Sequence, residues 1–337
     1  MPEHSSGICL NRSPNHGKGA SMKKTQKETN PFPYSDSNKR YYTMDYFMRQ
    51  KFGKKACKIP IDGGFSCPNR DGTKGFGGCI FCSPSGSGEF TGSGCNISLQ
   101  ISQGAEMMRK KWPDALLIPY FQSFTNTYAP LSVLKEKYSE ALSHPLSNGL
   151  CIATRPDCIT SEIADYLRFL SKENFIMVEL GLQTSSDKTA KLINRCHTTD
   201  EFIRGYNLLQ GVFTCIHIIN GLPGETHEDM MQTARFCASL RPDAIKIHML
   251  YIAEGTPVAE LYKQNRLNIL SRDEYVQTVC DQLEILPMST VIERVTGDAP
   301  GNTLLAPFWS KKKLEVHNEI DKLLFRRDSF QGIHCSL

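Results

Sequence analysis

The sequence predicts an α/β protein built on a parallel sheet, in which a barrel, full or partial, is favoured over a doubly wound sheet. Short apolar runs alternate with amphipathic segments six or seven times along the chain, as in consecutive strand–helix units. The chain has 337 residues, which is long enough for one large barrel. No G-x-G-x-x-G motif follows the first apolar run, which disfavours a dinucleotide-binding sheet.

Continuous apolar runs are typical of parallel strands, which are buried on both faces. The predicted strands span residues 56–61, 115–121, 149–154, 175–182, 213–219, 244–250 and 290–296. Between them, apolar residues recur at spacings of three and four, which predicts helices. The predicted helices span residues 97–112, 131–142, 160–172, 186–194, 199–210, 226–239, 272–286 and 314–326. Residues 41–52 are expected to form a short helix or strand that packs on the body.

The charge is uneven along the chain. Residues 1–58 carry 12 Lys and Arg against 4 Asp and Glu, whereas the whole chain has 39 against 35, so the body is mildly acidic. Residues 1–40 are rich in Ser, Asn, Lys, Pro and His and are expected to be largely disordered. This basic arm either contacts nucleic acid phosphates or is a solvated tail.

The sequence also indicates the cellular compartment of the protein. No run of 18 apolar residues is present, so we expect no transmembrane helix. The N-terminus lacks the apolar core of a secretory signal, so a cytoplasmic protein is expected. In that compartment the 13 cysteines are not expected to form a disulfide framework. Several sit within apolar patterns, as small buried side chains do: Cys151, Cys215, Cys237 and Cys280.

Residues 62–95 form a glycine-rich stretch that is expected to be a long loop after the first strand. It holds Cys67, Cys79 and Cys82 in the spacing C-x11-C-x2-C. Three thiols suit a [4Fe-4S] cluster with one iron left open for a small molecule. A structural zinc would need Cys95 as a fourth ligand, and unligated cysteines are the third alternative. Phe81 stands beside the cysteines, where it could flank an adenine.

In a barrel the chemistry lies at the carboxyl ends of the strands. Polar residues occur at nearly every predicted strand end, which indicates a polar rim facing the cysteine loop. Taken singly, each has a structural alternative: Glu179 could pair with Arg155, and His217 could be a satisfied core histidine. The residues at or near these ends are Gln122, Asn126, Arg155, Glu179, Gln183, His217, Asn220, Gly221, Lys246, His248, Glu293 and Arg294.

Taken together, these motifs resemble the radical SAM (S-adenosylmethionine) superfamily. The long gap before the C-x2-C pair is similar to the branch that contains the elongator catalytic subunit. More narrowly, the chain resembles the bacterial YtqA/YhcC-type family over residues 40–310. The matching strings are DGGFSCPNRDGTKGFGGCIFC, YFQSFTNTYAPL, IATRPDC, VELGLQT, HIINGLPGE and IKIHML.

The resemblance implies a partial (βα)6-type TIM barrel over residues 41–310, with a disordered arm over 1–40 and a C-terminal helix and tail over 311–337. Cys67, Cys79 and Cys82 would hold three irons of a [4Fe-4S] cluster, and SAM would chelate the fourth. Reductive cleavage of SAM, fed by a flavodoxin- or ferredoxin-like electron donor, would give a 5′-deoxyadenosyl radical. The implied SAM contacts are Phe81, Gln122, Asn126, Arg155, Glu179, Gln183, Asn220 and Gly221.

The resemblance also points to tRNA, and to conversion of a wobble-uridine 5-carboxymethylaminomethyl side chain to the 5-aminomethyl form. Lys246, His248 or Arg294 is then expected to bind the substrate carboxylate, while the arm and Lys311–Lys313 hold phosphates. Two other functions stay open. One is a radical SAM enzyme that acts on a small metabolite, and the other is a zinc-stabilised RNA-binding protein without catalysis.

Overall fold

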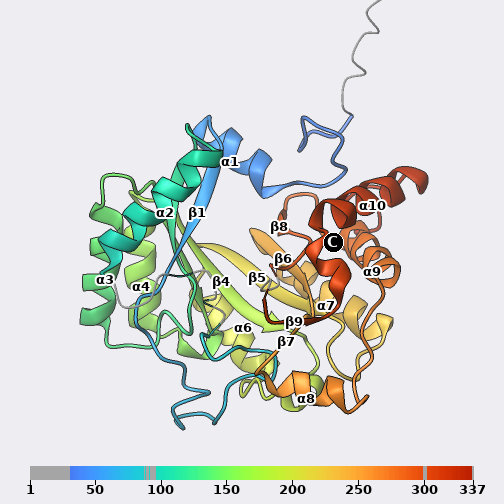
Figure 1. Cartoon of the computed structure of the whole chain (residues 1–337). Helices are drawn as coiled ribbons and strands as arrows, with labels where there is room; N and C mark the ends of the chain where they lie inside the picture. Colours follow the sequence, from blue (N-terminus) through green and yellow to red (C-terminus); the bar gives the residue numbers. More distant parts are fainter. Residues whose placement is uncertain (1–30, 87, 89–90, 92–95, 299–301, 336–337) are drawn as a thin grey trace, which may run out of the picture.

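The computed structural model describes residues 31–86, 88, 91, 96–298 and 302–335. Its centre is a curved sheet of seven strands, all parallel, in the order β1-β2-β3-β4-β5-β6-β8. The sheet does not close, because β1 and β8 stand at its two ends (Figure 1). The predicted partial barrel is therefore confirmed. Its strands are β1 (Ala56–Ile61), β2 (Leu116–Phe121), β3 (Leu150–Thr154), β4 (Ile176–Gln183), β5 (Phe213–Asn220), β6 (Ala244–Met249) and β8 (Val291–Arg294).

Helices cover the outer face of this sheet (Figure 1). Thr160 accepts the backbone N–H of Ile163 at the start of the helix Ser161–Ser171, and Thr226 accepts that of Asp229 at the start of the helix His227–Leu240. Outward-facing strand residues and the apolar stripes of the helices form the main core. The helices in chain order are α1 (Met44–Phe52), α2 (Ile97–Lys111), α3 (Leu131–Ser143), α4 (Ser161–Ser171), α5 (Asp187–Leu192), α6 (Thr199–Leu208), α7 (His227–Leu240), α8 (Pro257–Lys263), α9 (Arg272–Ile285) and α10 (Lys313–Arg326).

The end of the barrel where the strands begin is closed. The backbone N–H of Ile292 in β8 donates to the Tyr42 carbonyl at 2.7 Å, which fixes the segment before α1 against the edge strand. Met48 of α1 then packs into a buried apolar cluster inside the barrel. This cluster also contains Ile118, Tyr120, Cys151, Met177, Cys215, Ala244 and Val291. Polar side chains further along the strands therefore face the opposite, carboxyl end.

One region adds to the predicted architecture, and the predicted C-terminal helix is present. A two-stranded sheet of β7 (Ile252–Ala253) and β9 (Leu304–Ala306) lies with α8 near the carboxyl ends of the strands, and the sequence analysis did not foresee it. The helix α10 packs against α9. No described helix is long and apolar enough to cross a membrane.

The expected disorder of residues 1–40 is wrong for residues 31–40, while residues 1–30 lie outside the described part. The Phe32 ring lies 5.5 Å from that of Phe330, and Lys39 forms an ion pair with Asp321 at 2.6 Å. Aromatic side chains within this polar segment thus anchor it to the C-terminal region.

Candidate active site

The cysteine loop follows β1 and is held by backbone hydrogen bonds on both sides. The Ile80 N–H donates to the Ile193 carbonyl at 3.0 Å, and the Val258 N–H donates to the Ile80 carbonyl at 2.9 Å. The C-x2-C segment is thereby fixed between the α5 region and α8. Gly77 and Gly78 precede it with φ of 76° and 79°, a backbone conformation that glycine adopts without strain.

Two asparagines brace the same loop. The Asn69 side chain donates to the Asn194 carbonyl at 2.5 Å and lies 3.7 Å from the Cys79 sulfur. The Asn194 side chain donates in return to the Gly78 carbonyl at 2.7 Å. On the other side, Arg70 Nη2 lies 3.2 Å from the Cys82 sulfur. An amide thus lies beside Cys79 and a cation beside Cys82. Burial raises the pKa of the Cys79 thiol to about 12, so this thiol loses its proton on binding a metal.

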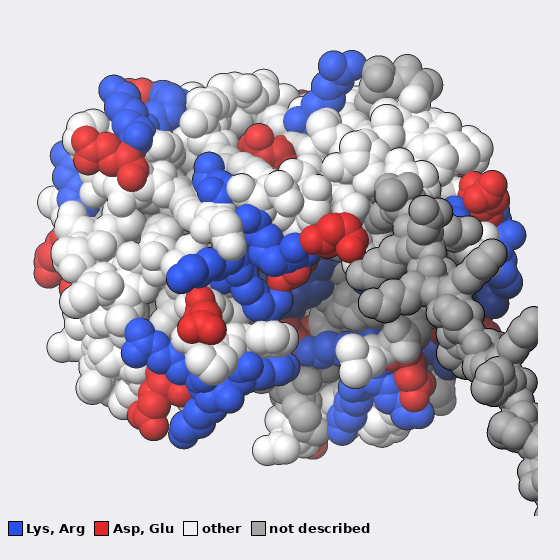
Figure 2. All heavy atoms as spheres, turned by 90° about the horizontal axis from the view of Figure 1, so that it is seen from above, with Lys and Arg blue, Asp and Glu red and all other residues white. Residues whose placement is uncertain are grey.

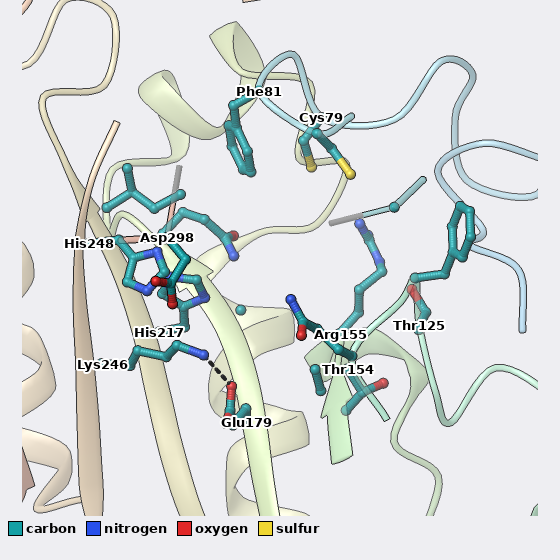
Figure 3. Close-up of a pocket in the computed structure, with 18 of the residues that line it drawn as sticks. Cys79, Phe81, Thr125, Thr154, Arg155, Glu179, His217, Lys246, His248 and Asp298 are labelled. Carbon is teal, nitrogen blue, oxygen red and sulfur yellow. Dashed lines mark hydrogen bonds and ion pairs between the residues drawn. The ribbon is translucent and has the colours of Figure 1, made fainter. Parts of the chain in front are cut away.

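A cavity of about 580 Å³ lies between this loop and the interior of the barrel. Figure 3 shows Cys79 and Phe81 at one end, Lys246 and Glu179 at the other, and Arg155 on the facing wall. All three predicted cysteines line it as thiols. The cavity thus joins the cysteine loop to the polar strand ends, as the sequence analysis expected.

A layer of buried charges forms the floor of the cavity. Lys58 Nζ on β1 makes ion pairs with both Glu179 on β4 and Glu293 on β8. Lys246 Nζ on β6 lies 2.8 Å from Glu179 and 3.9 Å from Glu293. The Tyr120 hydroxyl donates to Glu179 at 2.7 Å. Burial alone would raise the pKa of Glu179, but the ammonium groups of Lys246 and Lys58 outweigh it and hold this pKa well below its usual range.

Two histidines stand above this floor. The rings of His217 and His248 meet edge to face with their centroids 4.3 Å apart, and neither Nε2 has a hydrogen-bond partner among the described residues. Burial, with the nearby Lys246 cation, lowers the pKa of His217 to about 3. Burial and His217 lower the pKa of His248 well below its usual range. Both imidazoles are therefore neutral at neutral pH.

Arg155 does not pair with Glu179, so that structural alternative is wrong. Its guanidinium makes two hydrogen bonds to Asp157, both at 2.9 Å, and one to the Arg195 carbonyl at 2.8 Å. Burial would lower the pKa of Arg155, but the hydrogen-bonded Asp157 carboxylate raises it. Arg155 is thus a fixed cation on the cavity wall.

The structure brings most of the predicted site residues to one cavity: Cys67, Cys79, Phe81, Cys82, Gln122, Arg155, Glu179, Gln183, Lys246, His248 and Arg294. Three predicted SAM contacts lie elsewhere. The Asn126 side chain donates to the backbone carbonyls of Phe121 and Ala153, at 3.0 and 2.8 Å. Asn220 and Gly221 line a small separate hollow, where Asn220 and Gln282 exchange two hydrogen bonds of 2.9 Å. None of these three residues lines the large cavity, so their assignment as SAM contacts stays a prediction without support from the cavity geometry.

Lys58, Arg70 and Tyr120 line the cavity, although the sequence analysis did not select them. Lys58 could have been found, because a lysine within the apolar run ACKIPI must face a polar partner if it is buried. Arg70 lies between the first two cysteines, but no spacing rule ties it to a thiol. Tyr120 carried no signal, because tyrosine is common in ordinary strands.

The donor set fits an iron–sulfur cluster. No three His, Cys, Asp or Glu side chains in the described part converge tightly enough to share one metal ion. Three thiols instead line one end of a roomy cavity, and a cluster binds each thiolate through a separate iron. Cys95, the fourth ligand that a zinc site would need, lies outside the described residues.

Comparisons with known proteins agree with this geometry. Residues 75–237 match the Radical SAM superfamily model, and residues 242–326 match the Radical_SAM C-terminal domain. The chain is 47% identical over 308 residues to YtqA of Bacillus subtilis, covering 90% of this chain and 96% of that protein. It is 34% identical over 280 residues to YhcC of Escherichia coli, covering 82% and 90% respectively.

More distant similarity reaches a tRNA-modifying protein. The chain is 27% identical over 206 residues to the tRNA uridine(34) acetyltransferase of Methanocaldococcus infernus, covering 59% of this chain and 36% of that one. The solved structure of Elp3 from the same archaeon superposes with a TM-score of 0.61 at 16% identity, over 82% of this chain and 64% of that chain. That structure shares the fold.

Proposed function

This chain is a radical SAM superfamily enzyme of the YtqA and YhcC family, and we propose that it acts on tRNA, where it converts a 5-carboxymethylaminomethyl group on the wobble uridine to the 5-aminomethyl form. Enzymes of this superfamily bind a [4Fe-4S] cluster and SAM and need an electron donor. When bound, this pair would supply a carbon radical that takes a hydrogen atom from the methylene of the carboxymethyl group. Loss of one more electron to the cluster and addition of water would then break the C–N bond, leaving the 5-aminomethyl group and releasing glyoxylate, with SAM as the two-electron oxidant. The protein positions the reactants.

The similarity to a tRNA uridine(34) acetyltransferase is the observation that carries the choice of substrate. The matching region spans a third of that protein, so what is carried over is the uridine as target and not acetyl transfer. The long gap in the C-x11-C-x2-C loop resembles the branch that contains the elongator catalytic subunit, and this resemblance also supports tRNA as the substrate. The cavity of about 580 Å³ has room for a cofactor and an extruded nucleotide side chain.

The predicted residues that line the cavity beside the cysteine loop have the following roles in this proposal. Cys67, Cys79 and Cys82 hold the cluster. Phe81 flanks the adenine of SAM, since an aromatic face stacks on a base. The wall residues supply polar contacts to the rest of SAM: Gln122, Arg155 and Gln183.

The charges in the cavity favour one of the three predicted residues as the partner of the substrate carboxylate. Lys246 is already paired with Glu179, and His248 is neutral, so neither offers an uncommitted positive charge. Arg294 is paired as well, with Asp298, but its side chain is 35% exposed against 7% for Lys246, so a substrate carboxylate can compete with Asp298 for it. We assign carboxylate recognition to Arg294, with His248 as a neutral hydrogen-bond partner. Glu179 positions Lys246 rather than SAM.

The proposal is tested with reconstituted enzyme, a flavodoxin or ferredoxin reducing system, SAM and tRNA that carries the 5-carboxymethylaminomethyl group. Mass spectrometry of digested nucleosides should show the 5-aminomethyl form, with 5′-deoxyadenosine formed in step. Arg294→Gln should raise KM for tRNA while the cluster content stays normal. SAM cleavage that no tRNA stimulates would refute the substrate and favour a small metabolite.

A further inference from the structure

The cavity reaches the surface sideways, through the gap between the edge strands. Among its lining residues are Met107 and Met108 of α2, a helix that packs outside β1, together with Arg294 and Asp298 at the end of β8. Met107 is 63% exposed, so the cavity meets solvent there. We call the space bounded by these four residues the side opening.

Cations from distant parts of the chain lie near the side opening: Arg294 and Lys313 both pair with Asp298, and Lys111 lies one turn of α2 beyond Met107. Four of them form a basic rim: Lys55, Lys111, Arg294 and Lys313. Lys55 and Lys111 lie 4.6 and 5.6 Å from the ring of Trp112, which is 40% exposed. Burial and the neighbouring charges of Arg294 and Lys111 lower the pKa of Lys313, so these groups are close enough to repel one another. Figure 2 shows Lys and Arg side chains gathered around a hollow on one face of the molecule.

The acidic groups of the rim do not balance these cations. Asp45 pairs with Lys55, and Asp298 pairs with both Arg294 and Lys313. Lys111 makes no ion pair with any described residue. The rim therefore carries an excess of positive charge around an opening that leads to the cysteines, and such a surface attracts a polyanion.

We propose that the side opening is the entrance for the RNA substrate, with Lys111 and Lys313 holding phosphates on either side of the nucleotide that enters the cavity. This rests on the proposed function and adds the place where the RNA binds. Cations combined with an exposed aromatic ring are typical of surfaces that bind single-stranded nucleic acid. The floor ion pairs close the gap below the opening, so the base is directed toward the cysteine loop.

The test compares two double variants in their binding of fluorescein-labelled tRNA, measured by anisotropy over a range of salt concentrations. One variant is Lys111→Ala with Lys313→Ala. The matched control is Lys172→Ala with Arg204→Ala, which removes two exposed cations next to α4 and in α6, on the outer face of the sheet. Circular dichroism confirms that both variants are folded.

Each lost phosphate contact should reduce the slope of log K against log salt by about 0.7 to 0.9. Between 1 M and 0.1 M salt, each contact therefore contributes about a five- to eightfold gain in affinity, so the rim variant, which lacks two contacts, should bind about 25- to 60-fold more weakly near 0.1 M. The control should bind like the wild type. Equal affinities for the two variants would overturn the side opening as the RNA site and leave the proposed function intact. Wild-type protein that fails to bind tRNA in a salt-dependent way would overturn both.

A second measurement locates the RNA directly. A benzoylphenylalanine photocrosslinker replaces Met107 at the side opening, or Phe169 of α4, which is 64% exposed on the outer face. The proposal requires an RNA adduct at position 107 and none at position 169. The reverse pattern would place the RNA on the opposite side of the molecule.

Discussion

The Lys58→Met substitution tests whether the charged floor holds the open barrel together. Lys58 on the edge strand β1 makes close ion pairs with Glu179 of β4 and with Glu293 of β8, the edge strand at the other end of the sheet. The side chains of Glu179 and Glu293 are 3% and 6% exposed, so water replaces the lost partner poorly. Methionine keeps most of the length of the side chain and removes the ammonium group, with its charge and its hydrogen-bond donors.

The expected cost follows from the charge that remains. Lys246 stays 2.8 Å from Glu179 but 3.9 Å from Glu293, so the variant faces two buried carboxylates with one ammonium group. A unit pair at 4 Å is worth about 4 kcal/mol at an effective dielectric constant near 20. Removing one partner from a buried pair typically costs about 3–5 kcal/mol, so we expect a loss of about 4 kcal/mol.

Urea denaturation followed by circular dichroism at neutral pH measures this loss. The double variant Lys58→Met with Glu293→Leu should recover most of it, because it removes the uncompensated carboxylate. Arg168→Met is a control, since this residue pairs with the exposed Asp165 and should cost below about 1 kcal/mol. A Lys58→Met cost below about 1 kcal/mol, or a double variant no more stable than the single one, would refute the reasoning.

Three further predictions follow from the site. Alanine at any cluster cysteine should abolish the reconstituted iron and the EPR signal of the reduced protein, whereas Cys158→Ala should keep both; the three are Cys67, Cys79 and Cys82. Asn220→Ala should lower the free energy of unfolding by about 1–3 kcal/mol, because Gln282 loses a buried partner, and calorimetry should show unchanged SAM affinity. Since the folded pKa of His217 is about 3, below the ordinary value, the unfolded chain binds the extra proton, and stability should fall as the pH drops from about 6.5 toward 3. His217→Gln should flatten that dependence in urea titrations, and an unchanged slope would contradict the assignment.

The repeating units of the fold could be predicted because each one carries its own local signal. Apolar runs such as ALLIPYF leave little choice but a strand buried on both faces, and the observed β2 differs by one residue at its start. In contrast, β7 and β9 are two and three residues long and exist by pairing with each other across the chain. No local period marks such a pair, so sequence reasoning could not find it.

The parts of the site that could be predicted are those whose residue type requires a particular neighbour. Cysteines at close spacing and a lysine within a strand both imply partners. Asn220 was predicted to lie in the cavity, but the alternation of side chains along β5 argues against this. His217 and Ile219 line the cavity, so the next residue, Asn220, points to the outer face, where α9 lies. Asn126 follows the end of β2 in a loop, where no such alternation applies.

The backbone hydrogen bonds of Ile80 couple the stability of the cysteine loop to that of two other segments. They connect the segment between the cluster ligands to Ile193 on one side and to Val258, at the start of α8, on the other. A group that binds the folded loop and not the loosened one stabilises everything fixed to it, by mass action. Binding of the cluster should therefore raise the local stability of α8. Amide hydrogen exchange in residues 257–263 should slow when the cluster is assembled, which makes a helix without any ligand a reporter of the cofactor.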